Sequence, residues 1–211
     1  DLGGIYTYAA QPNTLIDNNS VHHVNGDYDA FGVYNDQGSR DITISNNVLY
    51  RNKSSNYFSW LIDSGYTLTL RNNILANSPE SQLRVGYFNG NGVVNVSRNL
   101  VYYAGGGDQE DPTAYGNAFW YGFNETMNSN NNLFFSTTGR GIWARSASSG
   151  SFDVDAGGGQ WYDWGFDRNS IFVDPLFVNP AADDYRLQPS SPGGNIGFDA
   201  GAIKYDFGAR Y

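Results

Sequence analysis

Short runs of alternating apolar and polar residues recur along the first two thirds of this chain, and each run leads into asparagine. Between Ile42 and Ser45 every second residue is an isoleucine, and two asparagines and two further apolar residues follow. Such alternation is typical of a short β-strand with one buried face. Related runs occupy 15–21, 42–49, 68–75, 94–101 and 127–134.

The last asparagine of these runs recurs at a nearly constant spacing. Successive gaps are 28, 26, 26 and 33 residues between Asn19, Asn47, Asn73, Asn99 and Asn132. A period near 26 without a helical pattern indicates one coil of short strands per repeat. Asparagine suits the corner of a coil because it tolerates a left-handed backbone and its amide can bond its neighbours. We therefore predict that these side chains stack as a hydrogen-bonded ladder.

A second apolar strand precedes each of these runs. The clearest copies are residues 4–8 and 32–36, and 60–63, 84–87 and 119–122 occupy the same place in later repeats. The sequence thus predicts an all-β fold, a right-handed parallel β-helix of about six coils over residues 1–152. Residues 153–211 are expected to be an irregular C-terminal closing segment of the same domain. The first coil lacks a capping sequence, so we expect missing N-terminal coils, or another subunit, to stack there.

Composition supports this fold and narrows the partners. The chain has 25 Asn and 26 Gly but three Glu, and 16% of its residues are aromatic, a mix typical of a turn-rich β-protein. The net charge of −9 argues against nucleic acid or an anionic membrane as a partner, because both attract clustered Lys and Arg. Cysteine is absent and no apolar stretch is long enough to span a bilayer.

Residues 1–8, 18–24 and 32–39 resemble the central coils of secreted bacterial β-helix enzymes that act on carbohydrates, nearest to glycoside hydrolase families 120 and 141. The tail, at 167–180 and 184–198, resembles the closing segment of the same group and of pectate-lyase-like β-helix proteins more widely. The resemblance covers nearly the whole chain. It is specific for the fold and weak for the reaction, since this fold carries hydrolases, lyases, epimerases and adhesins. It implies the C-terminal part of a longer protein, secreted or at the cell surface.

Glycoside hydrolysis uses two carboxyl groups, one protonated and one ionised. The resembling enzymes carry one acid in an Asp-x-Gly-x-Ile-Tyr segment and another after the next such strand, which implies Asp1 and Asp36 as the catalytic pair. Gln37 departs from this pattern, since a second acid often follows there. Alternation places Asp36 on the same face as Tyr34 and opposite Val33, so it is expected on the outer surface, where a turn-forming aspartate would also lie.

Aromatic and basic side chains recur beside the same strand in successive repeats. Aromatic faces stack on sugar rings and Arg binds sugar carboxylates, although aromatics in a solenoid also stack as core. Of the two histidines, His22 and His23, one is expected to face the Asp36 coil, where it would orient substrate. Two adjacent histidines without a third ligand make a poor metal site, so no metal is predicted. The candidate substrate-binding residues are Tyr6, Tyr8, His22, Tyr34, Trp60, Arg84, Tyr87, Trp120 and Arg145.

Three functions remain open from the sequence. A glycoside hydrolase acting on a polysaccharide or oligosaccharide, without a cofactor, is the first. A polysaccharide lyase is the second: with only Lys53 and Lys204 as lysines, Arg84 or Arg145 would be its base. A lyase would also use Ca²⁺, for which the acidic loop at 108–111 offers oxygen ligands from Asp108, Glu110 and Asp111. The third is a non-catalytic structural or glycan-binding β-helix that stacks into filaments.

Overall fold

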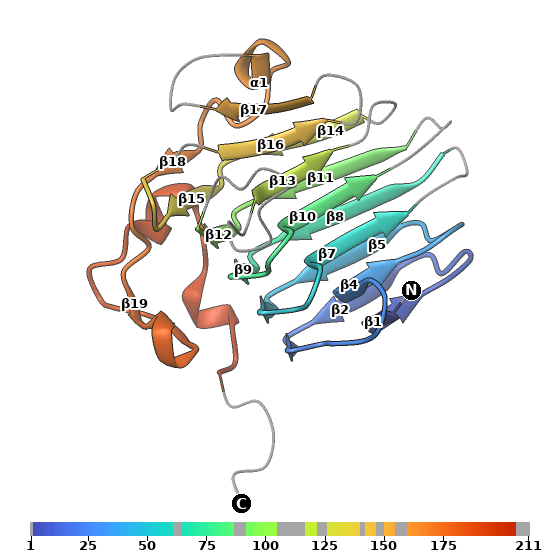
Figure 1. Cartoon of the computed structure of the whole chain (residues 1–211), viewed down its shortest axis with the longest axis horizontal. Coiled ribbons are helices and arrows are strands. Elements are labelled where there is room, and N and C mark those ends of the chain that lie inside the picture. The colour runs from blue at the N-terminus through green and yellow to red at the C-terminus, as the bar shows by residue number, and fades with distance from the viewer. Residues whose placement is uncertain are drawn as a thin grey trace, which may run out of the picture.

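Most described strands of this protein form three parallel sheets, as seen in a computed structural model of the 211-residue chain (Figure 1), and two short strands near the C-terminus form a separate antiparallel pair. The structure describes residues 2–60, 65–86, 92–104, 117–121, 126–139, 142–146, 150–154 and 160–205. All neighbouring strands in these sheets run parallel, except the last pair of the first sheet. The predicted all-β parallel β-helix is therefore confirmed.

Each sheet collects one strand from every coil. The first sheet contains β1 (Leu2–Thr7), β4 (Ala30–Asn35), β7 (Ser55–Trp60), β10 (Ser81–Gly86), β13 (Asn117–Tyr121), β16 (Ile142–Ser146) and β17 (Gly150–Val154). The second contains β2 (Thr14–Asp17), β5 (Ile42–Ser45), β8 (Thr67–Arg71), β11 (Val93–Ser97) and β14 (Thr126–Asn130). The third contains β3 (Ser20–His22), β6 (Val48–Tyr50), β9 (Ile74–Ala76), β12 (Leu100–Tyr103), β15 (Leu133–Ser136) and β18 (Ile171–Phe172).

Among the described strands five coils are complete, from β1–β2–β3 to β13–β14–β15. The sequence predicts about six. The difference arises after β16, which adds a strand to the first sheet but then turns back into antiparallel β17 instead of continuing into the second sheet. β18 later adds the corresponding strand to the third sheet.

The apolar residues at every second position of the strands point inward and fill the core. In the second sheet Ile44 pairs with Leu70, and both are fully buried, while Thr43 between the isoleucines faces outward. Burying such a side chain stabilises the fold by roughly 1.5–3 kcal/mol. The same inward rows from the three sheets meet in one core that runs the length of the stack.

The predicted asparagine ladder lies at the corner between the second and third sheets. Each Nδ2 donates to the Oδ1 of the ladder asparagine in the next coil, at 3.0–3.1 Å, from Asn19 to Asn132. The same Oδ1 also accepts the backbone N–H of the preceding asparagine. The residue before each ladder asparagine has a left-handed backbone, with φ of 53–57°, and at one coil this residue is Arg98. Asparagine is therefore required for the ladder rather than for the bend.

The ladder ends on a buried carboxylate. Asn132 donates its Nδ2 to Asp167 Oδ1 at 3.0 Å, and Ser129, Ser170 and Trp161 donate to the same carboxyl group. Burial raises the pKa of Asp167, and these four hydrogen bonds act against that rise. Because a carboxylate only accepts hydrogen bonds, it can close a chain of donors without needing an acceptor of its own.

The closing segment covers two surfaces. Near its start, Trp161 of α1 (Gln160–Asp163) packs against the far end of the core. Residues beyond 174 then descend along the outer face of the third sheet (Figure 1), where Phe177 and Tyr185 pack on Ile74 and Leu100. None of the helices in the described ranges is long and apolar enough to cross a membrane. The elements of this segment are β19 (Phe177–Asn179), η1 (Pro180–Ala182), β20 (Asp184–Leu187), η2 (Pro192–Ile196) and η3 (Ala200–Ala202).

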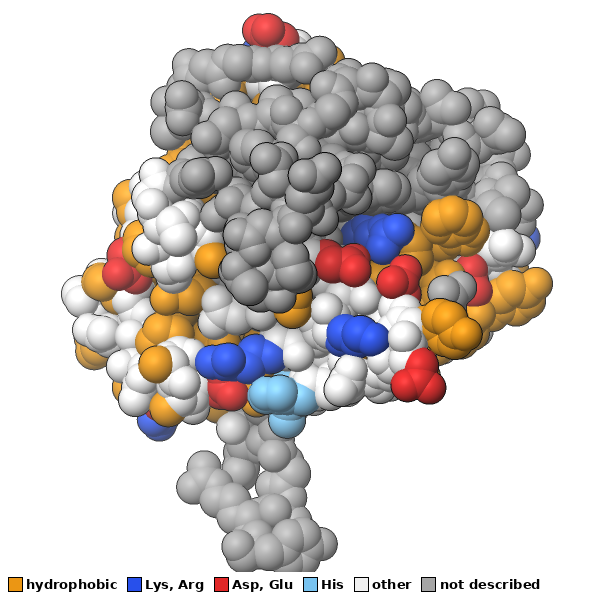
Figure 2. Space-filling view, in the orientation of Figure 1, with side chains coloured by type: hydrophobic (Ala, Val, Ile, Leu, Met, Phe, Trp, Pro, Cys, Tyr) orange, Lys and Arg blue, Asp and Glu red, His pale blue; other side chains and the backbone are white. Residues whose placement is uncertain are grey.

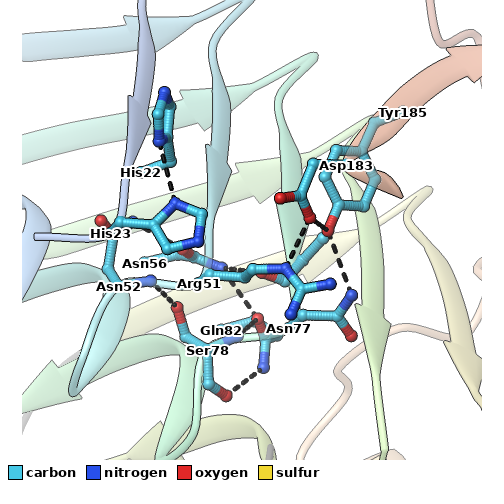
Figure 3. A network of polar contacts seen from close by, with 11 residues as sticks. His22, His23, Arg51, Asn52, Asn56, Asn77, Ser78, Gln82, Asp183 and Tyr185 are labelled. Atoms are coloured by element: carbon cyan, nitrogen blue, oxygen red, sulfur yellow. Dashed lines mark hydrogen bonds and ion pairs between the residues drawn. The ribbon is translucent and has the colours of Figure 1, made fainter. Parts of the chain in front are cut away.

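Polar contacts fasten the closing segment to the early coils. Arg51 forms an ion pair with Asp183 at 2.5 Å, and Asn77 donates to the Tyr185 hydroxyl at 3.1 Å (Figure 3). The backbone N–H of Lys204 donates to the side chain of the first-coil Asn18 at 2.8 Å. The segment therefore spans the stack instead of covering only its end.

We expect Asn73→Ala to destabilise the protein strongly. The change removes the acceptor used by Asn47 and the donor used by the Ile44 carbonyl and Asn99, all of them buried. Each buried group left unpaired costs about 1–3 kcal/mol, so a loss of roughly 3 kcal/mol or more is expected in urea unfolding. The matched control is Asn128→Ala, because the exposed Asn128 donates to Asn95 Oδ1 at the surface; this change should cost less than about 0.5 kcal/mol. Equal losses from both variants would contradict a stabilising ladder.

Candidate functional site

Strand register places several candidate residues in one outward row of the first sheet. Tyr6 pairs with Tyr34, Tyr34 with Phe58, and Phe58 with Arg84. We call these four residues the aromatic row. The register continues from Arg84 to the backbones of Trp120 and Arg145. Residues that recur at similar places in successive repeats of the sequence therefore lie beside one another on neighbouring strands of the first sheet.

The rings of the aromatic row pack on one another. Tyr34 stacks on Phe58 with centroids 4.8 Å apart, and Tyr6 meets Tyr34 edge-on at 5.2 Å. The Arg84 guanidinium lies 4.7 Å from the Phe58 centroid. Tyr34 is only 2% exposed, so its ring supports its neighbours and cannot offer a face to a ligand. Tyr6 and Tyr8, each about half exposed, remain available for stacking, and Trp60 is partly exposed.

Asp36 lies on the outer surface beside this row, on the same side as Tyr34, as alternation predicts. Tyr6 donates its hydroxyl to the Asp36 carboxylate, and the Gln37 N–H donates to the other oxygen at 2.7 Å. The hydrogen bond from Tyr6 to Asp36, together with burial and the Asp36 charge, raises the pKa of Tyr6 to about 12. Burial and the same carboxylate raise the pKa of Tyr34. Asp36 is thus a carboxylate held between phenols.

The two histidines belong to a different surface. Both are exposed, and their Nδ1 atoms lie 3.0 Å apart (Figure 3). His22 also stacks on Tyr50, with ring centroids 4.6 Å apart. Tyr50 is in the Asp36 coil but in the third sheet, whereas Asp36 follows a strand of the first. Burial and His23 lower the pKa of His22, and Asp183 opposes them. His22 therefore faces the Asp36 coil, as expected, but on the third sheet and not beside Asp36 itself. A role for His22 in binding substrate stays a prediction.

Sequence reasoning missed a pocket at the corner where the chain passes from the third sheet to the first. It has a volume of about 500 Å³. Figure 2 views the side on which first-sheet strands lie in front, and acidic and basic side chains lie close together there beside apolar ones. We call the pocket of about 500 Å³ the corner pocket; its lining residues are Asp27, Tyr28, Asp29, Lys53, Ser54 and Glu80.

Arg84 joins the corner pocket to the aromatic row. Its Nη1 lies 3.6 Å from Asp29 Oδ2 and 3.5 Å from Glu80 Oε2. These carboxylate oxygens are therefore no more than about 7 Å apart, an upper limit that is compatible with the carboxyl pairs of retaining glycosidases, about 5–5.5 Å apart. Burial raises the pKa of Glu80 and Arg84 opposes the rise. Because the Glu80 side chain is 51% exposed, water keeps this rise small.

The signal that could have found these acids is their place in the repeat. Asp29 lies just before β4, Lys53 and Ser54 just before β7, and Glu80 just before β10, so one corner of three coils supplies the whole pocket. The residue types change from coil to coil, which hides the position from any motif. Candidates on which the structure is silent are Asp1, Tyr87, Asp108, Glu110 and Asp111, outside the described residues, and Trp120 and Arg145, whose side chains are also outside them.

We expect Asp36→Asn to return the pKa of Tyr6 from about 12 towards the ordinary value of 10.0, because the hydrogen bond to a charged acceptor is its main cause. Between those two pH values the variant should then ionise one more tyrosine than the parent, measured by tyrosinate absorbance. The extra step should disappear in the double variant with Tyr6→Phe and persist in that with Tyr8→Phe. An unchanged titration in Asp36→Asn would show that the two side chains are not bonded in solution.

No protein-family model matches this chain, and neither a curated protein nor a solved structure does. The structure itself places the chain among proteins with a parallel β-helix fold. The resemblance to glycoside hydrolase families 120 and 141 stays a prediction.

Proposed function

We propose that this protein is a glycoside hydrolase that binds a sugar chain along the outer face of the first sheet and cleaves it with Asp29 and Glu80. The observation that carries the proposal is the pair of carboxylates bound to one guanidinium, no more than about 7 Å apart, in a pocket beside exposed aromatic rings. The resemblance to secreted carbohydrate enzymes supports the same class and an extracellular location.

Each carboxyl group has a distinct part in this proposal. Glu80, with its raised pKa, gives its proton to the glycosidic oxygen as the bond to the anomeric carbon breaks. Asp29, paired with Arg84, either directs a water molecule to that carbon or attacks it first. Water supplies the hydroxyl on the new reducing end, and its remaining proton restores the acid. The reaction needs neither a metal nor a cofactor.

Exposed aromatic rings supply the binding surface. Tyr28, at the mouth of the corner pocket, is 81% exposed, and Tyr6, Tyr8 and Trp60 present rings farther along the same face. Aromatic faces stack on the apolar faces of sugar rings and leave their hydroxyl groups in water. Asp36 then holds Tyr6 in place and does not react.

The charges favour a neutral glycan over a uronate. A lyase would use an arginine as its base, but Arg84 is paired with two carboxylates and lies over Phe58, so its guanidinium is already engaged. Asp27, Asp29 and Glu80 outnumber Lys53 in the lining of the corner pocket, and the whole chain carries −9. A sugar carboxylate would be repelled from this pocket.

The test is the release of reducing ends from neutral plant and algal polysaccharides. Glu80→Gln and Asp29→Asn should each lower kcat/KM by roughly 100-fold or more, because general acid–base groups contribute about that much. Asp36→Asn is the matched control on the same face and should keep most of the activity. Loss in Asp36→Asn alone would place the reaction at Asp36 instead. Unsaturated uronate products would show a lyase, and binding without products in the parent would show a glycan-binding protein.

The pH profile gives a further prediction. A general acid works only while protonated, so activity should fall as the pH rises through the pKa of Glu80, above the ordinary glutamate value. Arg84 lowers this pKa, so Arg84→Gln should move the alkaline limb of kcat/KM to higher pH. A limb that stays in place would show that Glu80 is not the acid.

A further inference from the structure

A second pocket lies on the outer face of the second sheet. It has a volume of about 360 Å³ and is lined by residues of β11 and β14 and by the turn at 164–166, which follows α1 in the closing segment. We call it the amide pocket. It shares no lining residue with the corner pocket, so it is a separate place at which a ligand could bind.

Four polar side chains form one side of the amide pocket. On β11, Asn95 and Ser97 alternate with buried valines and therefore point outward. In register, Asn95 pairs with Asn128 of β14, and the residue that pairs with Ser97 is Asn130. Paired residues on neighbouring strands lie about 4.8 Å apart, and two residues along a strand span about 6.5 Å. The four side chains therefore mark the corners of a patch about as large as one sugar ring.

The hydrogen bonds of these side chains leave both donors and an acceptor at the pocket. Asn128 donates its Nδ2 to Asn95 Oδ1 at 3.0 Å. The Oδ1 of Asn130 accepts the backbone N–H groups of Asn131 and Asn169. Within the described residues, no protein group bonds the Nδ2 of Asn95 or Asn130, or the Oδ1 of Asn128. A sugar hydroxyl, which both donates and accepts hydrogen bonds, matches these groups.

Aromatic rings stand beside the amides. Trp164 and Phe166 both line the amide pocket, each is partly exposed, and their ring centroids lie 6.2 Å apart. Gly165 between them has a φ of 91°, a conformation that a residue with a side chain adopts only with strain. The turn that presents both rings therefore depends on this glycine. An aromatic face next to amide groups can receive the apolar face of a sugar ring and its hydroxyl groups together.

The lining of the amide pocket excludes other classes of ligand. Every described residue that lines it is neutral. Ca²⁺ would need carboxylates, and a phosphate or a uronate would need Arg or Lys, so neither charge type is served there. The edge of β14 is also engaged, because the Asp167 N–H donates to the Ser129 carbonyl at 2.7 Å. A peptide therefore cannot add to the sheet as a strand at this point.

We propose that the amide pocket binds a neutral sugar unit of an oligosaccharide or polysaccharide without cleaving it. The sugar hydroxyls accept hydrogen bonds from Asn95 and Asn130 and donate to Asn128 Oδ1, while the apolar face of the ring stacks on Trp164. No carboxyl group among the described lining residues is available for hydrolysis. The proposal does not rest on the glycosidase assignment. On a hydrolase, such a site raises the local concentration of polymer at the enzyme.

The experiment titrates the protein with neutral hexasaccharides of glucose, mannose and xylose. All proteins carry Glu80→Gln, so that the proposed hydrolysis does not consume the ligand. Calorimetry gives the dissociation constant, and NMR follows the side-chain amide signals of Asn95 and Asn128, which should shift on binding even if the first sheet also binds sugar.

Asn95→Asp is the most selective variant. It keeps the oxygen that accepts from Asn128 and removes only the free N–H donors, so we expect an unchanged midpoint of thermal unfolding and binding about tenfold weaker. Trp164→Leu should weaken binding as much; because Trp164 also packs against the core, Asn95→Asp decides the question if this variant does not fold. The matched control is Thr43→Val, two coils away in the same outward row, which should bind normally.

Three results would overturn the proposal. One is neutral-sugar binding that Asn95→Asp leaves unchanged, and another is the absence of any amide shift at millimolar hexasaccharide. The third is equally tight binding of a hexamer of galacturonate, which would refute the neutral class. If the unmodified chain releases no reducing ends but the Asn95 and Asn128 signals shift, the glycosidase assignment fails and the amide pocket stands.

Discussion

Stacking in register, coil upon coil, is the constraint on which this structure depends, and the asparagine ladder enforces it. A ladder amide can bond the next coil only if the corner arrives at the same height in each turn. Loops of different lengths are accommodated elsewhere: the ladder step lengthens to 33 residues before Asn132, yet the hydrogen bond there is 3.1 Å. Because the corner is fixed in every coil, residues that recur in the sequence align as rows of side chains on each face of the solenoid.

The candidate site follows from this arrangement. Because one corner recurs in successive coils, Asp29 and Glu80 come from different turns of the solenoid and still share Arg84. Arg84 also lies over Phe58, so one side chain contacts both the carboxylates of the corner pocket and the aromatic row. A rigid stack is well suited to hold groups that must stay at a fixed separation.

The sequence predicts the repeat, the fold and the outward position of Asp36, because period-two alternation and a recurring asparagine act locally. It does not predict the pair formed by Asp29 and Glu80. Whether these two side chains come close depends on the number of residues in each coil, and this number varies along the chain. It places His22 against the Asp36 coil but does not show that the two residues lie on different sheets, because one coil contributes a strand to each sheet. The path of the closing segment along the third sheet depends on a long-range contact, such as that between Arg51 and Asp183, which leaves no local pattern.

The ladder also gives the solenoid an electrical direction. Every ladder amide from Asn47 onward turns its oxygen towards the earlier coil and gives one N–H to the later layer, while the other N–H bonds a backbone carbonyl of the earlier coil. The carbonyl dipoles of these side chains therefore share one direction along the stack, as peptide dipoles do along a helix. The positive end of this line meets the buried carboxyl group of Asp167, and the negative end is the carbonyl oxygen of Asn19. In the described part of the chain the helices are all short, so the ladder, and not a helix, makes the two ends of the stack chemically different.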